Sequence, residues 1–128
     1  MLEGRCLCGG IAYTIDGAVG PIDLCHCSFC RRASGSAFAS NATIRRDDFA
    51  FVTGEELLRE YESSPEKLRS FCSRCGSPIY ARQRAAPQIL RIRLGTLTSD
   101  PGSRPGGHYD VASKADWYTI TDDLPQEP

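Results

Sequence analysis

The chain has little of what marks several common classes of protein. Lysine and histidine each occur only twice in 128 residues, and acidic and basic residues nearly balance, with a formal net charge of −1. This balance gives no electrostatic reason to expect a nucleic-acid partner. No apolar run approaches the roughly 20 residues of a membrane span, and the first residues lack a basic segment followed by an apolar one. We therefore expect a cytoplasmic protein without membrane or nucleic-acid partners.

Helical patterns are scarce, whereas short segments rich in β-branched and aromatic residues recur between turn signals. The sequence predicts a mainly β protein with one helical turn at residues 28–34. Strands are expected at 10–16, 37–44, 49–52, 57–61, 68–71, 79–82 and 89–94. The last of these, ILRIRL, alternates aliphatic residues with Arg, as a strand with one solvated face does.

The connections carry few signs of a division into parts. Residues 99–107, SDPGSRPGG, predict a loop, and no internal linker is long enough to separate two domains. The length is that of a single domain, 1–128, which would be small enough to benefit from a covalent or metal cross-link. Residues 126–128 of the Pro-rich, acidic end are expected to fray.

Cysteine, by contrast, is abundant, and the seven residues fall into three local units. The units are a C-x-C of Cys6 and Cys8, a C-x-C-x2-C of Cys25, Cys27 and Cys30, and a C-x2-C of Cys72 and Cys75. An odd number of cysteines in a reducing compartment favours metal binding or catalysis over disulfides. Disulfides and iron–sulfur ligation stay open as alternatives.

The spacing within each unit suits metal ligation. Residues i and i+2 of a strand point to the same side, and C-x2-C at a tight turn is a common zinc spacing. If each unit stays intact, the two pairs together supply the four thiolates of a closed zinc site. The triplet is then left with three thiolates, which is the pattern of a site with an open fourth position.

The fourth position of the triplet has several candidate occupants. A water or a substrate could take it, or the cysteines could form a redox-active cluster without metal. His108 follows a Gly-rich loop and could reach as a protein ligand. His26 alternates with its cysteine neighbours, so that on a strand it would point away from them.

Four segments of the chain resemble one known family. GRCLCGGIAYTI, CHCSFCRRASGSAF, FCSRCGSPIY and GHYDVASKADWYTITDDLP occur in the order typical of the glutathione-dependent formaldehyde-activating enzymes, a family related to centromere protein V. The resemblance covers residues 3–125. It implies a zinc-stapled β-tent fold with small antiparallel sheets, related to that of B-type methionine sulfoxide reductases. It also implies two Zn²⁺ ions, one structural on the two cysteine pairs and one catalytic on the triplet.

The resemblance further implies a carbon–sulfur lyase of the S-(hydroxymethyl)glutathione synthase type, acting on a small thiol and an aldehyde such as formaldehyde. Three thiolates leave zinc a weak Lewis acid, better suited to binding a fourth thiol than to activating water. Catalysis is therefore assigned to the three cysteines of the triplet. The residues predicted to bind substrate are Arg31, Arg32 and Ser34 beside the triplet, with Lys114 and Trp117 from the tail.

Two functions outside catalysis stay open. The same zinc-stabilised scaffold could bind a partner protein, or the triplet could sense metal or redox state by gaining and losing its ion. The true substrates, a homo-oligomeric state and the occupancy of the second site are not determined by the residues. Trp117 could equally be a core aromatic residue and Lys114 a surface charge.

Overall fold

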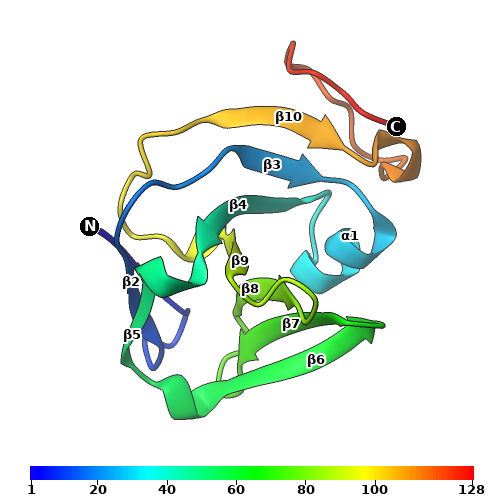
Figure 1. The fold of residues 1–128 in the computed structure, drawn as a ribbon. Coiled ribbons are helices and arrows are strands. Elements are labelled where there is room, and N and C mark those ends of the chain that lie inside the picture. Colours follow the sequence, from blue (N-terminus) through cyan, green and yellow to red (C-terminus); the bar gives the residue numbers. More distant parts are fainter.

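The protein is built from ten strands and a single α-helix, and the computed structural model describes all residues 1–128. The strands are β1 (Leu2–Arg5), β2 (Ala12–Ile15), β3 (Ile22–Cys25), β4 (Ala39–Arg45), β5 (Phe49–Thr53), β6 (Leu58–Ser64), β7 (Lys67–Cys72), β8 (Pro78–Gln83), β9 (Ile89–Arg93) and β10 (Pro105–Tyr109), and the helix is α1 (Ser28–Ser34). Figure 1 shows the helix beside the ends of β3 and β4.

Two sheets form the fold, which confirms the prediction of a mainly β protein. One sheet has the order β1-β2-β5, and the other has the order β10-β3-β4-β9-β8-β7-β6. All pairs are antiparallel, as the resemblance implies, except β10 with β3, which is parallel. The seven-residue helix matches the expected residues 28–34. The structure contains no helix with the length and apolar character needed to span a membrane.

Three strands were not expected from the sequence: β1, β3 and β10. The expected loop at residues 99–107 is wrong at its end, because residues 105–109, PGGHY, form β10. Proline and glycine are unfavourable in strands, so local propensity did not indicate it. The strand forms because its register with β3, interrupted by a bulge, gives its backbone groups partners.

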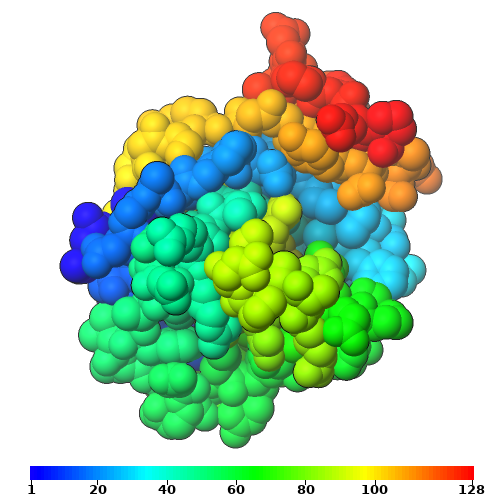
Figure 2. Space-filling model, viewed as in Figure 1, coloured from blue at the N-terminus to red at the C-terminus, as the bar shows by residue number.

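The last residues form a further extended segment against β10. The His108 amide donates to the Pro125 carbonyl at 2.8 Å, and the Glu127 amide donates to the His108 carbonyl at 2.9 Å. Gln126 forms a bridge with the same histidine, so Gln126 and Glu127 are paired instead of frayed. Figure 2 shows this segment, in red, as a ridge on the surface of the molecule.

The hydrophobic core lies between the two sheets. Its buried residues come from both sheets and from the loops between them: Cys6, Ile11, Tyr13, Ile15, Ile44, Cys72, Ile79, Tyr80, Leu90 and Ile92. Two of the seven cysteines, Cys6 and Cys72, thus belong to the core itself, at 2% and 0% exposure. The burial of these two cysteines fixes the loop between β1 and β2 against the β7–β8 turn of the other sheet.

Candidate metal centres and active site

The two cysteine pairs come together at one end of the core. The Sγ atoms of Cys6, Cys8, Cys72 and Cys75 all lie within 4.8 Å of one another. Cys6 and Cys8 are 3.6 Å apart, and Cys8 and Cys72 are 3.9 Å apart. Tetrahedral zinc with Zn–S bonds of about 2.3 Å places its sulfur atoms about 3.8 Å apart, so the donor set fits a closed zinc site.

Tight turns present these sulfur atoms. In the β7–β8 turn, the Gly76 amide donates to the Cys72 carbonyl at 2.7 Å, and Gly76 has a φ of +80°. This left-handed conformation is easily adopted only by glycine, which explains the sequence CSRCG. The Leu7 amide reaches across to Ser77 Oγ at 2.9 Å and so joins the two cysteine loops.

Hydrogen-bond donors surround the sulfur atoms of the first pair. The amides of Gly10 and Ile11 donate to Cys8 Sγ at 3.4 Å and to Cys6 Sγ at 3.3 Å. Arg74 Nε donates to Cys8 Sγ at 3.4 Å and is the main cause of the lowered pKa of that thiol. Donors of this kind stabilise thiolates, which are the form that binds metal.

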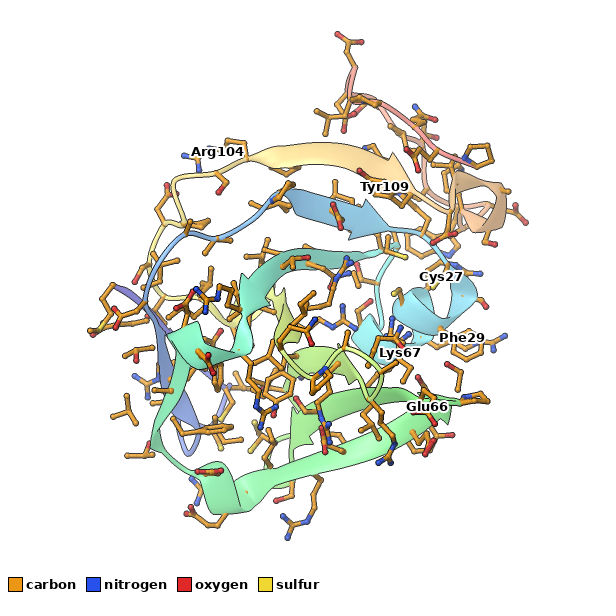
Figure 3. All side chains as sticks on the ribbon, in the orientation of Figure 1. Cys27, Phe29, Glu66, Lys67, Arg104 and Tyr109 are labelled. Atoms are coloured by element: carbon orange, nitrogen blue, oxygen red, sulfur yellow. The ribbon has the colours of Figure 1, made fainter.

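The remaining three cysteines form a second cluster, at the junction of β3 and α1. The Sγ atoms of Cys25, Cys27 and Cys30 lie within 4.8 Å of one another. Cys27 is the N-cap of the helix, and its sulfur accepts a hydrogen bond from the Cys30 amide at 3.3 Å. Figure 3 shows Cys27 at the start of the helix, close to the end of β3. The cluster offers three ligands to a metal from this chain.

Hydrogen bonds and charges around the triplet favour a thiolate at Cys30. The pKa of Cys30 is lowered to about 4, chiefly by a hydrogen bond from Cys25, with a smaller contribution from Arg69. The pKa of Cys25 is raised for the same reason, because the two thiols share one proton. Asp110 Oδ2 lies 3.2 Å from the Cys25 sulfur and is an alternative acceptor for the same proton, and this aspartate has a left-handed φ of +56°.

Two cavities flank Cys30, which lines both. The first, about 380 Å³, is lined by twelve residues, among which Arg93 is the only lysine, arginine or acidic residue. It includes Ser34 and several other hydroxyl and small side chains. The second, about 370 Å³, is strongly polar and contains Cys25 together with Lys67, Arg91 and Arg93. The triplet therefore borders one nearly neutral space and one charged space.

The structure places the predicted substrate-binding residues next to the triplet at different positions. Ser34 lines the neutral cavity, and its hydroxyl donates to the Cys30 carbonyl at 2.7 Å. Arg31 Nε donates to the Ser113 carbonyl at 3.2 Å. Arg32 lines a separate surface groove that contains none of the cysteines. Helix α1 thus brings Ser34 to the neutral cavity, whereas neither arginine lines either cavity.

The predicted tail residues do not line the cysteine cavities. Lys114 Nζ donates to the carbonyls of Ala115, at 3.1 Å, and Tyr118, at 2.6 Å. Trp117 is 72% exposed, so it is not a core residue, and neither it nor Lys114 lines a cavity beside Cys30. Lys114 instead stabilises the turn that precedes the final segment.

His108 has protein partners at both ring nitrogens. Its Nδ1 is 2.8 Å from His26 Nε2, and its Nε2 is 3.0 Å from Asp122 Oδ2. Both histidines are buried, and neither belongs to the group of donors formed by the triplet. The structure does not bring His108 to the fourth ligand position. His108 is instead within hydrogen-bond distance of His26, the residue between Cys25 and Cys27.

Several residues of the charged cavity were not singled out from the sequence. They are Lys67 on β7, Asn41 on β4, and Arg91 and Arg93 on β9. The alternation in ILRIRL was the available signal, because it put both arginines on one face of a strand. That face was interpreted as solvated, whereas Arg93 is only 9% exposed and faces the cavity.

Comparisons with known proteins agree with the resemblance seen in the motifs. The model of the family described as glutathione-dependent formaldehyde-activating enzyme matches residues 1–113. A protein of Halomonas elongata named as such an enzyme is 30% identical over 128 residues, which cover 94% of this chain and 81% of that protein. An uncharacterized lyase of Schizosaccharomyces pombe is 31% identical over 78 residues, 61% of this chain and 55% of the relative.

One solved structure extends the agreement to the fold. The crystal structure of a Rhodobacter sphaeroides protein matches with a TM-score of 0.65 and 28% identity, and the match covers 80% of this chain and 97% of that one. The family match spans most of the chain, including all seven cysteines. The chain belongs to the glutathione-dependent formaldehyde-activating enzyme family.

Proposed function

We propose that the protein is a zinc-dependent enzyme that joins a small, glutathione-like thiol to an aldehyde such as formaldehyde, in the manner of S-(hydroxymethyl)glutathione synthase. The observation that carries the proposal is the cluster of three cysteine sulfur atoms between two cavities. The family name supports glutathione and formaldehyde as substrates, and the lyase name of one relative supports the reaction class. In the reverse direction the enzyme would be a carbon–sulfur lyase.

Both clusters have donor sets suited to zinc. The four-cysteine cluster would hold a structural ion, and Cys25, Cys27 and Cys30 would hold the second one. Zinc bound by three thiolates supplies a fourth position at which a thiol loses its proton. Seven cysteines without a disulfide suit a reducing compartment, and we propose the cytoplasm.

The reaction is an addition in which all atoms are retained. The thiol sulfur forms a bond to the carbonyl carbon, and the C=O double bond becomes a single bond to a hydroxyl group. The proton lost by the thiol ends on that oxygen. The protein would contribute chiefly by holding both reactants next to each other, which converts an encounter in solution into a reaction between bound groups.

We assign the two reactants to the two cavities that Cys30 lines. The neutral cavity, which contains the Ser34 side chain and has little charge, suits an uncharged aldehyde. The charged cavity suits a thiol with ionised groups. Asp110, whose Oδ2 lies 3.2 Å from Cys25 Sγ, is placed to accept a proton released at the triplet.

Cysteine substitutions in the two clusters test the proposal. Cys27→Ser should remove about one zinc per chain and abolish the thiol-dependent consumption of formaldehyde while the circular dichroism spectrum stays native. Cys72→Ser should remove the structural ion and unfold the domain, because its sulfur lies in the core. The matched control is Ser73→Ala, next to Cys72 but exposed. If the two cysteine variants behave alike, the division into a structural and a catalytic site is wrong.

A further inference from the structure

Arg93 is a buried cation without a carboxylate partner. It is 9% exposed, and the one hydrogen bond of its guanidinium goes to the Asn41 side-chain oxygen. The ion pairs of the molecule use other arginines, and no acidic group lies within 4.0 Å of Arg93. A buried charge is costly unless it is paired, so this site calls for an anion.

Lys67 makes a second unpaired cation in the same cavity. It begins β7, is half-buried, and has neither an ion pair nor a hydrogen bond from its ammonium group. Figure 3 shows it at the end of the β6–β7 hairpin nearest to the helix, with Tyr109 on β10 across the sheet. Burial lowers the pKa of Lys67, as expected for an ammonium group without a counter-ion.

Neither acidic residue of the cavity pairs with Lys67 or Arg93. Asp23 pairs with Arg91 at 2.8 Å, and Asp110 Oδ2 lies 3.2 Å from Cys25 Sγ. The charges of Lys67 and Arg93 therefore remain available to a molecule that enters the cavity next to the triplet. Neither Arg31 nor Arg32 lines this space.

We propose that Arg93 and Lys67 select a thiol substrate that carries a carboxylate, by binding that carboxylate while the sulfur reaches the triplet. The proposal rests on the proposed function and assigns the residues that determine thiol specificity at the same site. The neighbouring neutral cavity offers the contrast, because Arg93 lines it without a second cation. The alternative role for both cations is to balance the negative charge of the cysteine sulfur atoms, which are close enough for Arg93 to lower the pKa of Cys30.

Two thiols of similar size separate these roles. Mercaptoacetate carries a carboxylate, whereas 2-mercaptoethanol has a hydroxyl group in its place. Calorimetric titration of the zinc-loaded protein should show mercaptoacetate binding about tenfold more tightly or better, as expected for one charge-assisted hydrogen bond. Equal affinity of the wild-type protein for the two thiols would overturn the proposal but leave the proposed function standing. Failure of the wild-type protein to bind either thiol would contradict both.

Variants identify the residues responsible. Arg93→Met and Lys67→Met should each reduce the preference for mercaptoacetate by about tenfold, with 2-mercaptoethanol affinity and zinc content unchanged. Lys67→Met is less prone to disturb folding, because Lys67 is only half-buried and Asn41 keeps its hydrogen bond from Arg93. The control is Arg45→Met, whose side chain is 77% exposed at the far end of β4. If the two cavity variants bound both thiols equally more weakly, the cations would serve to balance the negative charge of the sulfur atoms. That result would refute the proposal.

Discussion

Ser70 shows how a single hydroxyl group can replace backbone pairing. The register of β7 and β8 shifts between Arg69 and Phe71, where the ladder is interrupted. At this point Ser70 Oγ donates to the Tyr80 carbonyl at 2.9 Å and accepts from the Tyr80 amide at 3.0 Å. Both groups are buried and would otherwise lack partners, so the side chain completes the sheet.

Ser70→Ala should therefore be costly for so small a change. It leaves a buried amide and a buried carbonyl unpaired, and we expect a loss of about 1–3 kcal/mol in the free energy of unfolding. Urea denaturation measures this loss. Ser103→Ala, in the loop after β9, removes a hydroxyl without a hydrogen bond and should be nearly neutral. Equal stability of the two variants would contradict the role given to Ser70.

Glu60 and Arg82 provide a residue-scale prediction for pH. They bind each other across the intervening strand β7 through two hydrogen bonds of 2.6 and 2.7 Å. The hydrogen bond from Arg82 is the main cause of the lowered pKa of Glu60. A carboxyl group whose pKa is lower in the folded state stabilises the protein above its unfolded pKa of about 4.3, and this contribution is lost as the pH falls through the folded value.

Glu60→Gln should thus destabilise the protein by about 0.5–1 kcal/mol at pH 7, since the pair is partly exposed. The difference from the wild-type protein should shrink as the pH falls below about 4.3 and vanish once the pH lies below the lowered pKa of Glu60 in the folded protein. Chemical denaturation across this pH range tests it, with Glu56→Gln, an exposed residue, as the control. A difference that does not depend on pH would argue against the ion pair as its source.

At the scale of elements, the link between the three-stranded sheet and the cysteine loop depends on Gly54. This residue follows β5 with a φ of +83°, and a Cβ atom here would lie 2.1 Å from the Gly10 carbonyl oxygen. Thr53 Oγ1 donates to the same carbonyl at 3.2 Å. The end of β5 therefore packs directly on the loop that presents Cys8.

Gly54→Ala should destabilise the protein more than Gly102→Ala. Gly102 has nearly the same φ, +82°, but no heavy atom lies within 4 Å of the point where a Cβ atom would stand. Only the backbone strain of about 1 kcal/mol therefore applies there. The steric conflict at Gly54 should add at least about 1 kcal/mol more. Thermal unfolding of the two variants measures the difference, and equal melting temperatures would show that the close approach is easily relieved.

The elements also show what the sequence can and cannot predict. Seven strands and α1 were expected near their observed positions because their residues favour those structures locally. β10 was missed because its Pro and Gly residues oppose strand formation and its partners, β3 and the final segment, are remote in sequence. Likewise, the spacing of cysteines predicted both clusters, but nothing local showed that Arg93 is buried beside Cys30.

For the molecule as a whole, the two clusters should differ in how they hold metal. The four-cysteine cluster includes two core residues, Cys6 and Cys72, whereas the triplet opens to two cavities. Loss of an ion from the first cluster should loosen the contact between the sheets. Loss from the second should affect mainly the loop before α1 and the cavities beside it.

A chelator should therefore remove zinc in two stages. The first equivalent should leave at low chelator concentration without a change in circular dichroism, and the second should leave together with unfolding. A zinc-binding dye and a simultaneous spectrum follow both events. Release of both ions in one step, with unfolding, would mean that the two clusters are equally structural.

The close approach of Cys8 and Cys72 also has a consequence for the synthesis of the chain. Their sulfur atoms are 3.9 Å apart but 64 residues apart in sequence. At a synthesis rate of about 5–20 residues per second, the first cysteine pair waits roughly 3 to 13 s for its partners. During that interval two neighbouring thiols are exposed on an incomplete chain, open to oxidation or to capture of the wrong ion. If the cluster holds a metal ion as proposed, correct assembly of the protein would depend on the redox state and metal supply around the ribosome.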